Sequence, residues 1–258
     1  MHGNEYTDDF IAKFELMWGE GFLSPGGPAE VAKILEGTDL TGLDVMDIGC
    51  GIGGVDVLLA RDYGAKSVTG IDVEEPLVER CRARAKRTGL ADRLTFLLVE
   101  PGPLPFADAS FDAVFSKDSM IHIPDKAALF AEVFRVLRPG GLFLASDWMQ
   151  SAAGPGSPEM AIFVEKSGLS FTLGITDDLP AALESAGFTD IRVVDRNPWY
   201  REEGPKELAL MRGEFRQPLL DILGREKADQ WIEMRIAMVS ALNAGVFRPT
   251  HFRAARPA

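Results

Sequence analysis

The chain has 258 residues, of which 46% are hydrophobic, a composition that suits one large α/β domain or a domain with a subdomain. Its net charge of -12 argues against nucleic acid and anionic membranes as partners. The two cysteines, Cys50 and Cys81, form neither a disulfide framework nor a metal-binding motif, so we expect no metal. The polar N-terminus does not resemble a signal peptide, and no apolar run is long enough to span a bilayer. We therefore expect a soluble cytoplasmic protein.

The predicted elements begin with an amphipathic helix over residues 9–20, a turn-rich loop over 22–28 and a helix over 29–35. A regular alternation follows, with strands at 44–48, 67–72, 94–99, 113–116 and 142–146, and helices at 55–63, 76–88 and 126–137. Strands that alternate with helices predict parallel pairing through right-handed crossovers.

This rhythm changes after Asp147. Residues 151–158 are rich in Gly, Ser and Pro and predict a flexible connection. A helix (176–186), a strand (191–195), two or more helices (205–243) and a last strand (245–253) follow. We therefore predict a doubly wound α/β fold: a mostly parallel, seven-stranded, Rossmann-like sheet with a helical cap inserted in the C-terminal half. Its parts are an N-terminal lid segment (1–28), a cofactor-binding core (29–150), and the cap with the final strands (151–258).

A glycine-rich turn, Asp-Ile-Gly-Cys-Gly-Ile-Gly-Gly at 47–54, follows the first strand and opens a helix. Glycines let the backbone approach a ligand closely, and the helix N-terminus offers free N–H donors. Asp47 can accept from an ammonium group or a water, and Asp72, at the end of the second strand, lies where a ribose diol binds. The pattern predicts adenosine binding without naming the cofactor, because dehydrogenases share the acid; a tight turn with solvent-facing acids is the alternative.

Four motifs resemble the class I S-adenosylmethionine-dependent methyltransferases: the D-x-G-x-G-x-G turn, Gly70-Ile71-Asp72, the stretch Pro-Phe-Ala-Asp-Ala-Ser-Phe-Asp before the fourth strand, and Leu-Arg-Pro-Gly-Gly at 137–141. The resemblance covers residues 40–147 and implies S-adenosyl-L-methionine as cofactor. Glu100 falls where that family usually places an Asp for the adenine amino group. The predicted cofactor contacts are Asp47, Gly49, Gly51, Gly53, Asp72, Val73, Glu100, Leu23, Ser24 and Lys117.

The N-terminal segment and the residues after the fourth strand resemble the phosphoethanolamine N-methyltransferases. The matching stretches are Tyr-Thr-Asp-Asp at 6–9, Trp-Gly-Glu at 18–20, Leu-Ser-Pro-Gly-Gly at 23–27 and Ser-Lys-Asp-Ser-Met-Ile-His at 116–122. The resemblance implies that Tyr6 and His122 form a latch over the site and that Asp118 faces the substrate amine. It also places Leu23 and Ser24 at the cofactor.

The chemistry of methyl transfer favours the same residues. An amine becomes cationic as it attacks, so a carboxylate at Asp118 can hold it and stabilise the developing charge. His122, with a reference pKa near 6.5, can accept the proton, although a hydrogen-bonded structural histidine is the alternative. Tyr6 could instead be a surface aromatic, and His251 is expected to be structural.

One departure concerns phosphate. Phosphobase methyltransferases clamp the substrate phosphate with tyrosines, an arginine and a lysine, whereas residues 167–172 here read Ser-Gly-Leu-Ser-Phe-Thr. A phosphate needs cationic or multiple donor groups, and the remaining candidates are Lys166, Arg201, Arg235 and Arg248. A non-phosphorylated amine therefore stays open. Trp148, Trp199 and Trp231 could line a pocket for a methylated ammonium by cation–π attraction, or simply pack in the core.

The resulting prediction is a transferase that moves a methyl group to the amine of a small acceptor, with Asp118 and His122 as the catalytic pair, Tyr6 as the latch, and an oligomeric state that the sequence does not indicate. The alternatives are an O- or C-methyltransferase acting on a small natural product, an NAD-dependent oxidoreductase, and a non-catalytic cofactor-binding module. No Ser/Tyr/Lys hydride-transfer set follows the fifth strand, which speaks against the oxidoreductase.

Overall fold

The computed structural model describes residues 6–168 and 170–258. Its centre is one seven-stranded sheet in the order β3-β2-β1-β4-β5-β9-β8. The first five strands along the chain pair in parallel, and β9 runs antiparallel to both of its neighbours, which confirms the predicted mostly parallel sheet. The strands are β1 (Asp44–Ile48), β2 (Ser67–Asp72), β3 (Leu94–Leu98), β4 (Phe111–Lys117), β5 (Leu137–Asp147), β8 (Thr189–Asp195) and β9 (Thr250–Ala255).

The order of the strands reverses between β1 and β4, because the chain moves outward from β1 to β3 and then returns to the other side of β1. In open α/β sheets this switch point forms a crevice at the carboxyl ends of the strands, where ligands bind. The glycine-rich turn follows β1, and Asp118 follows β4 directly. The topology therefore brings the two predicted halves of the site to one edge.

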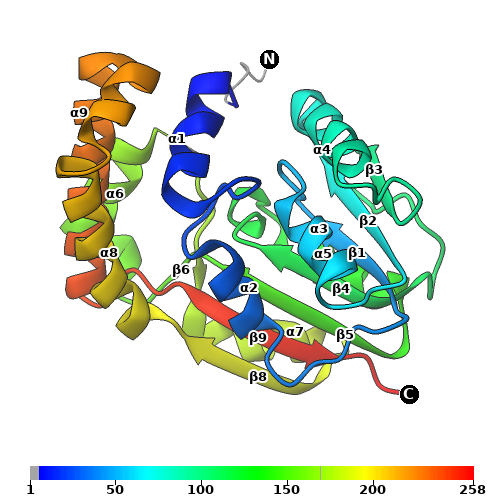
Figure 1. Ribbon diagram of the computed structural model, residues 1–258. Helices are drawn as coiled ribbons and strands as arrows, with labels where there is room; N and C mark the ends of the chain where they lie inside the picture. The colour runs from blue at the N-terminus through cyan, green and yellow to red at the C-terminus, as the bar shows by residue number, and fades with distance from the viewer. Residues whose placement is uncertain (1–5, 169) are drawn as a thin grey trace.

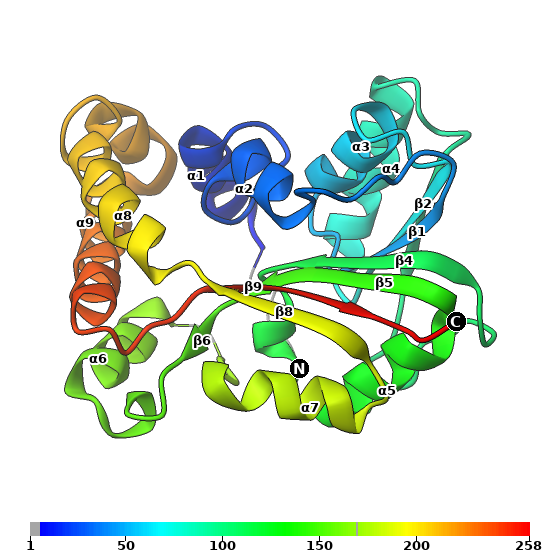
Figure 2. The same ribbon diagram turned by 90° about the horizontal axis from the view of Figure 1, so that it is seen from below.

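Helices cover both faces of this sheet (Figure 2). Alternate side chains of β1 explain why: Val45 packs toward one layer of helices, and Met46 and Ile48 pack toward the other. The first layer is α2 (Gly27–Ile34), α3 (Gly54–Arg61) and α4 (Glu75–Arg87), and the second is α5 (Lys126–Val136) and α7 (Leu179–Ser185), which follows the short 3-10 helix η3 (Thr176–Asp178).

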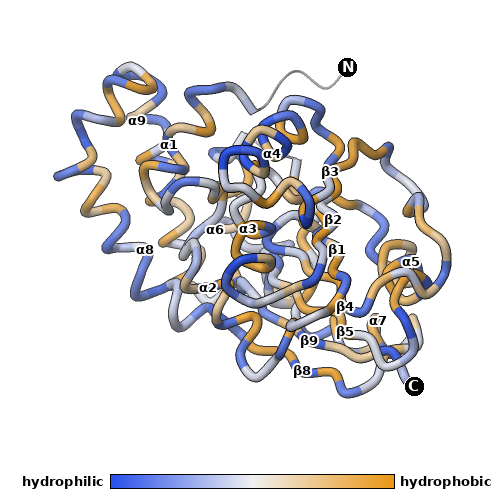
Figure 3. Tube along the Cα trace, turned by 45° about the vertical axis from the view of Figure 1, so that its right-hand side comes forward, coloured by the Kyte–Doolittle hydropathy of each residue, from blue (hydrophilic) through white to orange (hydrophobic). Residues whose placement is uncertain are grey.

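A separate column of helices forms the cap at one end of the sheet (Figure 1). It contains α6 (Pro158–Ser167), α8 (Asn197–Arg212) and α9 (Arg216–Asn243), and it has its own apolar core around Phe163, Met238 and Phe247. The helix α1 (Asp8–Trp18) lies between this column and the helices of the core in both views. Figure 3 shows apolar residues along the central strands and mixed polar and apolar residues along α8 and α9. Within the two described ranges, no helix is both long enough and apolar enough to cross a membrane.

Some local predictions need correction. The segment predicted as a flexible connection, 151–158, contains the 3-10 helix η2 (Gly154–Gly156) and the first residue of α6, a helix that we did not predict. Ser157 caps α6, since its hydroxyl accepts from the N–H of Met160, and Pro158 occupies the first helical position. Two short strands, β6 (Met149–Gln150) and β7 (Gly174–Ile175), then pair in parallel beside the cap.

Three larger differences concern where elements begin. The fifth strand begins at residue 137 rather than 142, the last strand at residue 250 rather than 245, and α8 at residue 197 rather than 205. A residue with positive φ, Gly224, divides α9, so the predicted two or more helices over 205–243 are observed.

Candidate active site

A cavity of about 1940 Å³ opens at the carboxyl ends of β1, β2 and β4. Its walls come from the glycine-rich turn, from α1, and from the cap helices α6 and α9. All but one of the predicted site residues line it: Tyr6, Leu23, Ser24, Asp47, Gly49, Gly51, Asp72, Val73, Glu100, Lys117, Asp118 and His122. The exception is Gly53: a Cβ at this position would point at Cys81 of α4, 3.2 Å from its Sγ, and the cofactor contact of Gly53 stays a prediction.

The other glycines of the turn have the geometry of a ligand cradle. Gly49 and Gly51 have φ values of 72° and 56°, in the region that side chains disfavour. A Cβ on Gly49 would lie 2.3 Å from the Cβ of Ser119, and one on Gly51 would lie 3.2 Å from the Leu23 side chain. Leu23 of the N-terminal loop therefore lies directly over Gly51. A larger residue at position 49 would collide with Ser119, and one at position 51 would press against Leu23.

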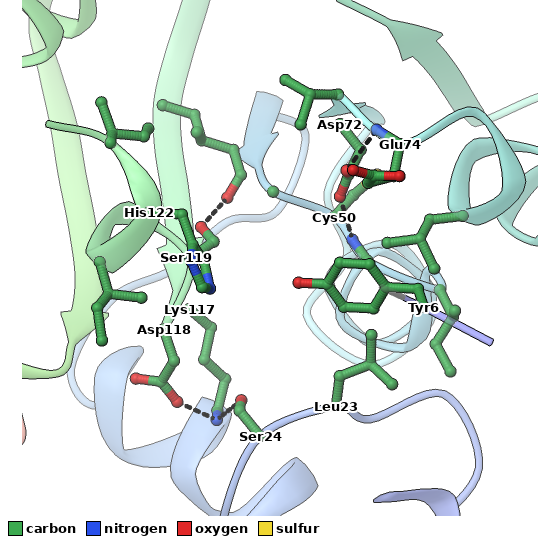
Figure 4. A pocket seen from close by; sticks show the side chains of 18 of the residues that line it. Tyr6, Leu23, Ser24, Cys50, Asp72, Glu74, Lys117, Asp118, Ser119 and His122 are labelled. Atoms are coloured by element: carbon green, nitrogen blue, oxygen red, sulfur yellow. Dashed lines mark hydrogen bonds and ion pairs between the residues drawn. The ribbon is translucent and has the colours of Figure 1, made fainter. Parts of the chain in front are cut away.

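Asp72 connects this turn to the end of β2 (Figure 4). One carboxylate oxygen accepts from the N–H of Gly51 at 3.0 Å, and the other accepts from the N–H of Glu74 at 3.1 Å. Burial raises the pKa of Asp72 to about 6, although these backbone donors oppose the shift. The carboxylate keeps lone pairs for further donors, so it can receive the hydroxyls of a ribose.

Two more carboxylates, Asp47 and Asp56, lie buried behind the turn. Burial, and then the neighbouring Asp56, raise the pKa of Asp47 well above its ordinary value. Burial likewise raises the pKa of Asp56 to about 7. Within the described chain, no other residue donates a hydrogen bond to Oδ1 of Asp47 or to the carboxylate oxygens of Asp56, and the two carboxyl groups interact with each other. Asp47 also lines the cavity, so the site offers a buried acceptor that fits a cationic ligand.

Asp118 and Lys117 form a buried ion pair at the end of β4, with N–O distance 2.8 Å and side chains that are 3% and 4% exposed. Asp118 has a φ of 55°, and its second oxygen accepts from the Ser146 hydroxyl at 2.8 Å. Lys117 also donates to the carbonyl oxygen of Pro25 at 3.0 Å and to the Ser24 hydroxyl. Although Lys117 lines the cavity, its ammonium is occupied in joining Asp118 to the N-terminal loop, a role that the sequence did not predict.

His122 ends a short 3-10 helix, η1 (Met120–His122), on the same side of the cavity. Its Nδ1 lies 3.2 Å from the carbonyl oxygen of Ser170. A carbonyl oxygen only accepts, so Nδ1 is the donor in this contact, and in the neutral ring Nε2 then carries the lone pair that a base needs. In Figure 4 the hydroxyl of Tyr6 points into the cavity toward the side where His122 lies, and the latch between them stays a prediction.

Aromatic rings line the N-terminal wall. Tyr6 and Phe10 lie 5.3 Å apart between ring centroids, Phe10 and Phe14 4.7 Å, and Phe14 and Trp18 4.9 Å. Phe14 also meets Trp231 of α9 at 5.7 Å. These rings form one stripe because residues four apart share a helix face.

The candidates for phosphate binding divide into two groups. Lys166 and Arg235 line the cavity, but Lys166 lies 3.6 Å from Glu233 and Arg235 pairs with Glu207. Arg201 and Arg248 do not line it. Of the three tryptophans, Trp148 and Trp231 line the cavity and Trp199 does not, while His251 pairs with Glu30 at 3.0 Å, outside the cavity.

Sequence reasoning missed Ser146 and Asp147, which end β5. Asp147 is buried and accepts from the N–H of Ile121 at 2.9 Å, so it positions η1. Burial raises its pKa to about 7. Two polar residues at the end of an otherwise apolar strand were the signal that could have identified them.

The strand order, the glycine cradle and the carboxylates of Asp47 and Asp72 beside it are those of one class of protein, the class I S-adenosylmethionine-dependent methyltransferases. A family model described as a methyltransferase domain matches residues 45–141. The chain is 34% identical over 213 residues to methyltransferase GfsG of Streptomyces halstedii, covering 81% of this chain and 73% of that protein. The chain belongs to this methyltransferase family, for which S-adenosylmethionine is the methyl donor, and this membership does not favour the oxidoreductase alternative.

Within the family the chain is similar to phosphoethanolamine N-methyltransferases. It is 33% identical over 205 residues to phosphoethanolamine N-methyltransferase 1 of Arabidopsis thaliana, covering 79% of this chain but 40% of that enzyme. Phosphoethanolamine N-methyltransferase 2 of Haemonchus contortus, solved with phosphomonomethylethanolamine and S-adenosylhomocysteine, superposes with a TM-score of 0.89 at 26% identity, over 98% of this chain and 59% of that one. The chain thus spans less than half the length of such plant relatives.

Proposed function

We propose that this protein transfers the methyl group of S-adenosylmethionine to the amine nitrogen of a small acceptor. The observation that carries the proposal is the buried Asp118 carboxylate, which lies with His122 on one side of the cavity that the glycine turn lines on the other. The similarity to phosphoethanolamine N-methyltransferases supports an amine as the nucleophile.

The residues of the glycine turn fit the cofactor. Asp72 would hold the ribose hydroxyls, and Gly49 and Gly51 would let the backbone approach the ligand. Asp47 carries the buried oxygen without a donor that suits the ammonium of the amino-acid tail, directly or through a water. Glu100 and Val73, on the cavity wall, would contact the adenine end. When bound, the cofactor supplies an electrophilic methyl group on a sulfonium.

The catalytic roles follow from charge. Asp118 already accepts from Lys117 and Ser146, but a carboxylate has about four lone-pair sites, so it can also accept from an amine. There it would orient the nitrogen and stabilise the positive charge that develops during attack. His122, with its proton on Nδ1, would take the proton of the amine at Nε2. Tyr6 would cover the site and exclude water.

The test is transfer of a labelled methyl group to a panel of amines, phenols and alkenes, with product mass and position determined. Methylation at nitrogen that is lost in Asp118→Asn, while S-adenosylhomocysteine still binds, is the expected result. Product found only on oxygen or carbon would support the O- or C-methyltransferase alternative instead.

A further inference from the structure

We infer that the acceptor is an amine attached to an apolar body, aromatic or aliphatic, and not a phosphorylated amine. This inference rests on the proposed function and names the substrate class of the same cavity. The proposed subsite for the apolar body is a wall of three rings, Trp148, Phe163 and Phe171, which we call the aromatic wall.

The aromatic wall is a compact group. Its ring centroids are 6.0 Å apart for Trp148 and Phe163, 6.0 Å for Trp148 and Phe171, and 6.1 Å for Phe163 and Phe171. Phe163 is fully buried, whereas Trp148 and Phe171 are half-buried and line the cavity. Phe247 supports the wall from the cap core, 5.4 Å from Trp148 and 5.0 Å from Phe163. Partly exposed rings in a concave site gain most from an apolar ligand that covers them.

The aromatic wall is fixed beside the proposed reacting centre. The ring of Phe171 lies 5.8 Å from the ring of His122. The N–H of Thr172 donates to the carbonyl oxygen of Ile121 at 2.8 Å, and Gly174 pairs with Met149 in the β6–β7 sheet. The chain directly after Phe171 is therefore hydrogen-bonded to Ile121 and paired with β6, which holds Phe171 in the wall.

Apolar surface continues across the cavity to α1 and α9. Phe10 and Phe14 of α1 and Trp231 and Met234 of α9 also line it. An acceptor that reaches from Asp118 toward the cap would thus meet rings along its path.

The charges of the cavity argue against a phosphate. Each Lys and Arg among the described lining residues already has a partner. The two buried cations, Lys117 and Arg235, could bind a phosphate only by giving up a carboxylate, which is costly, whereas Lys166 and Lys227 are 41% and 65% exposed and their ion pairs contribute little. Four are paired with carboxylates and the fifth, Lys13, lies over three rings, with its Nζ 4.1 Å from the centroid of Phe10, 4.8 Å from Phe14 and 5.1 Å from Trp231. The pairs are Lys117 with Asp118, Lys166 with Glu233, Lys227 with Asp9, and Arg235 with Glu207.

The experiment measures equilibrium binding by calorimetry in the presence of saturating S-adenosylhomocysteine. The probes are 2-phenylethylamine and hexylamine, compared with ethanolamine and phosphoethanolamine. We expect both apolar amines to bind at least tenfold more tightly than either small amine. Phe171→Leu and Trp148→Leu should each weaken 2-phenylethylamine at least fivefold. The matched control is Phe215→Leu, a half-buried phenylalanine that does not line the cavity, which should change nothing.

Affinity for S-adenosylhomocysteine serves as the folding check for every variant. Tighter binding of phosphoethanolamine than of the apolar amines would overturn the inference, as would an unchanged affinity for 2-phenylethylamine in both folded wall variants, or no binding of either apolar amine. Product analysis separates the two proposals. Methylation of phosphoethanolamine alone would support amine methylation and overturn the apolar acceptor, whereas tight binding of apolar amines without N-methylated product would support the wall and overturn the proposed function.

Discussion

The backbone N–H of Gly51 donates a hydrogen bond to the carboxylate of Asp72, with 3.0 Å between nitrogen and oxygen. This bond fixes the shape of the glycine turn by a residue from the neighbouring strand. It also leaves the carboxylate facing the cavity, where a ribose would bind. The same residue therefore shapes the cradle and receives the ligand.

Asp72→Asn should weaken binding of S-adenosylhomocysteine about 10- to 150-fold, because a hydrogen bond to a charged group contributes about 1.5–3 kcal/mol. Gly51→Val should abolish binding, since its side chain would meet Leu23 and strain a backbone with φ of 56°. Calorimetric titration measures both effects. Asp39→Asn is the matched control, because Asp39 also accepts from a backbone N–H, that of Thr41, but lies outside the cavity. Unchanged affinity in both site variants would refute the assignment.

Cofactor affinity should depend on pH through the carboxylate of Asp72. Burial raises the pKa of Asp72 to about 6, so the group is charged above that pH and neutral below it. A neutral carboxyl is a weaker acceptor for ribose hydroxyls, and the dissociation constant should therefore rise as the pH falls from 7 to 5. Calorimetry across this pH range, repeated with Asp72→Asn, shows whether Asp72 is the titrating group, because the dissociation constant of the variant should not change with pH. A pH profile shared by protein and variant would assign it to another group.

Asp56 should make the protein more stable in mild acid. Burial raises its pKa to about 7 in the folded state, against 3.8 for an exposed aspartate. Between these values the folded state binds more protons than the unfolded state, so its contribution to the free energy of unfolding increases as the pH falls from above 7 toward 4. Asp56→Asn should stabilise the fold at pH 8 by about 1–3 kcal/mol, and should flatten the pH dependence. Urea unfolding at pH 8 and at pH 5.5 measures the free energy of unfolding and its change with pH. A variant less stable than the parent at pH 8 would show that the Asp56 carboxylate has a stabilising partner.

The core of the fold was predictable because its signals are local. Strands and helices over 44–147 follow from apolar periods and from glycine and proline at the turns. The helix α6 was missed because Ser157-Pro158, a cap and first helical residue, looks like one more part of a flexible loop.

The site was predictable in its residues but not in their contacts. Neighbours in a strand point to opposite faces, so no pattern indicates that Lys117 and Asp118 pair. They meet because Asp118 leaves the strand with φ of 55°, which depends on the tertiary hydrogen bonds to Ser146. Burial of Asp56 and Asp147 is also a tertiary property.

Asp118 and His122 should both be required for turnover. Asp118→Asn should lower kcat about 100-fold or more, and His122→Ala by about 100- to 10,000-fold, with cofactor affinity within twofold of the parent. Steady-state kinetics with an amine that proves to be an acceptor measures this. Removing Asp118 alone leaves Lys117 buried and unpaired, so the double variant Lys117→Met with Asp118→Asn is the control; it should regain thermal stability but not turnover. Full turnover in either single variant would refute its role.

The lid should be shorter than the predicted segment 1–28, of which residues 1–5 lie outside the described chain. Three contacts fix the chain after residue 14: Arg84 pairs with Glu15 at 3.0 Å, the N–H of Gly21 donates to Glu15 at 2.7 Å, and the N–H of Gly54 donates to the carbonyl oxygen of Gly21 at 3.2 Å. A Cβ on Gly54 would come within 2.2 Å of that carbonyl oxygen, so the segment lies directly on the first turn of α3.

Residues 6–14 are held differently. Their ion pairs are the exposed contacts of Asp9 with Lys227 of α9, at 2.9 Å, and of Asp8 with Arg80 of α4. Their apolar contacts are made by the aromatic rings and by the buried side chain of Ile11, which packs with Ile52 and Leu77. Exposed ion pairs contribute little, so the cost of opening this part is mainly the exposure of these apolar side chains. We expect hydrogen exchange to show protection of residues 8–14 that increases about tenfold or more with S-adenosylhomocysteine and an acceptor amine, whereas residues 15–22 stay protected in both states. Tyr6→Phe should lower turnover more than cofactor affinity, because closure excludes water during the reaction. Equal, strong protection of residues 8–14 with and without ligands would show that α1 is a fixed wall of the cavity and that the acceptor enters by another path.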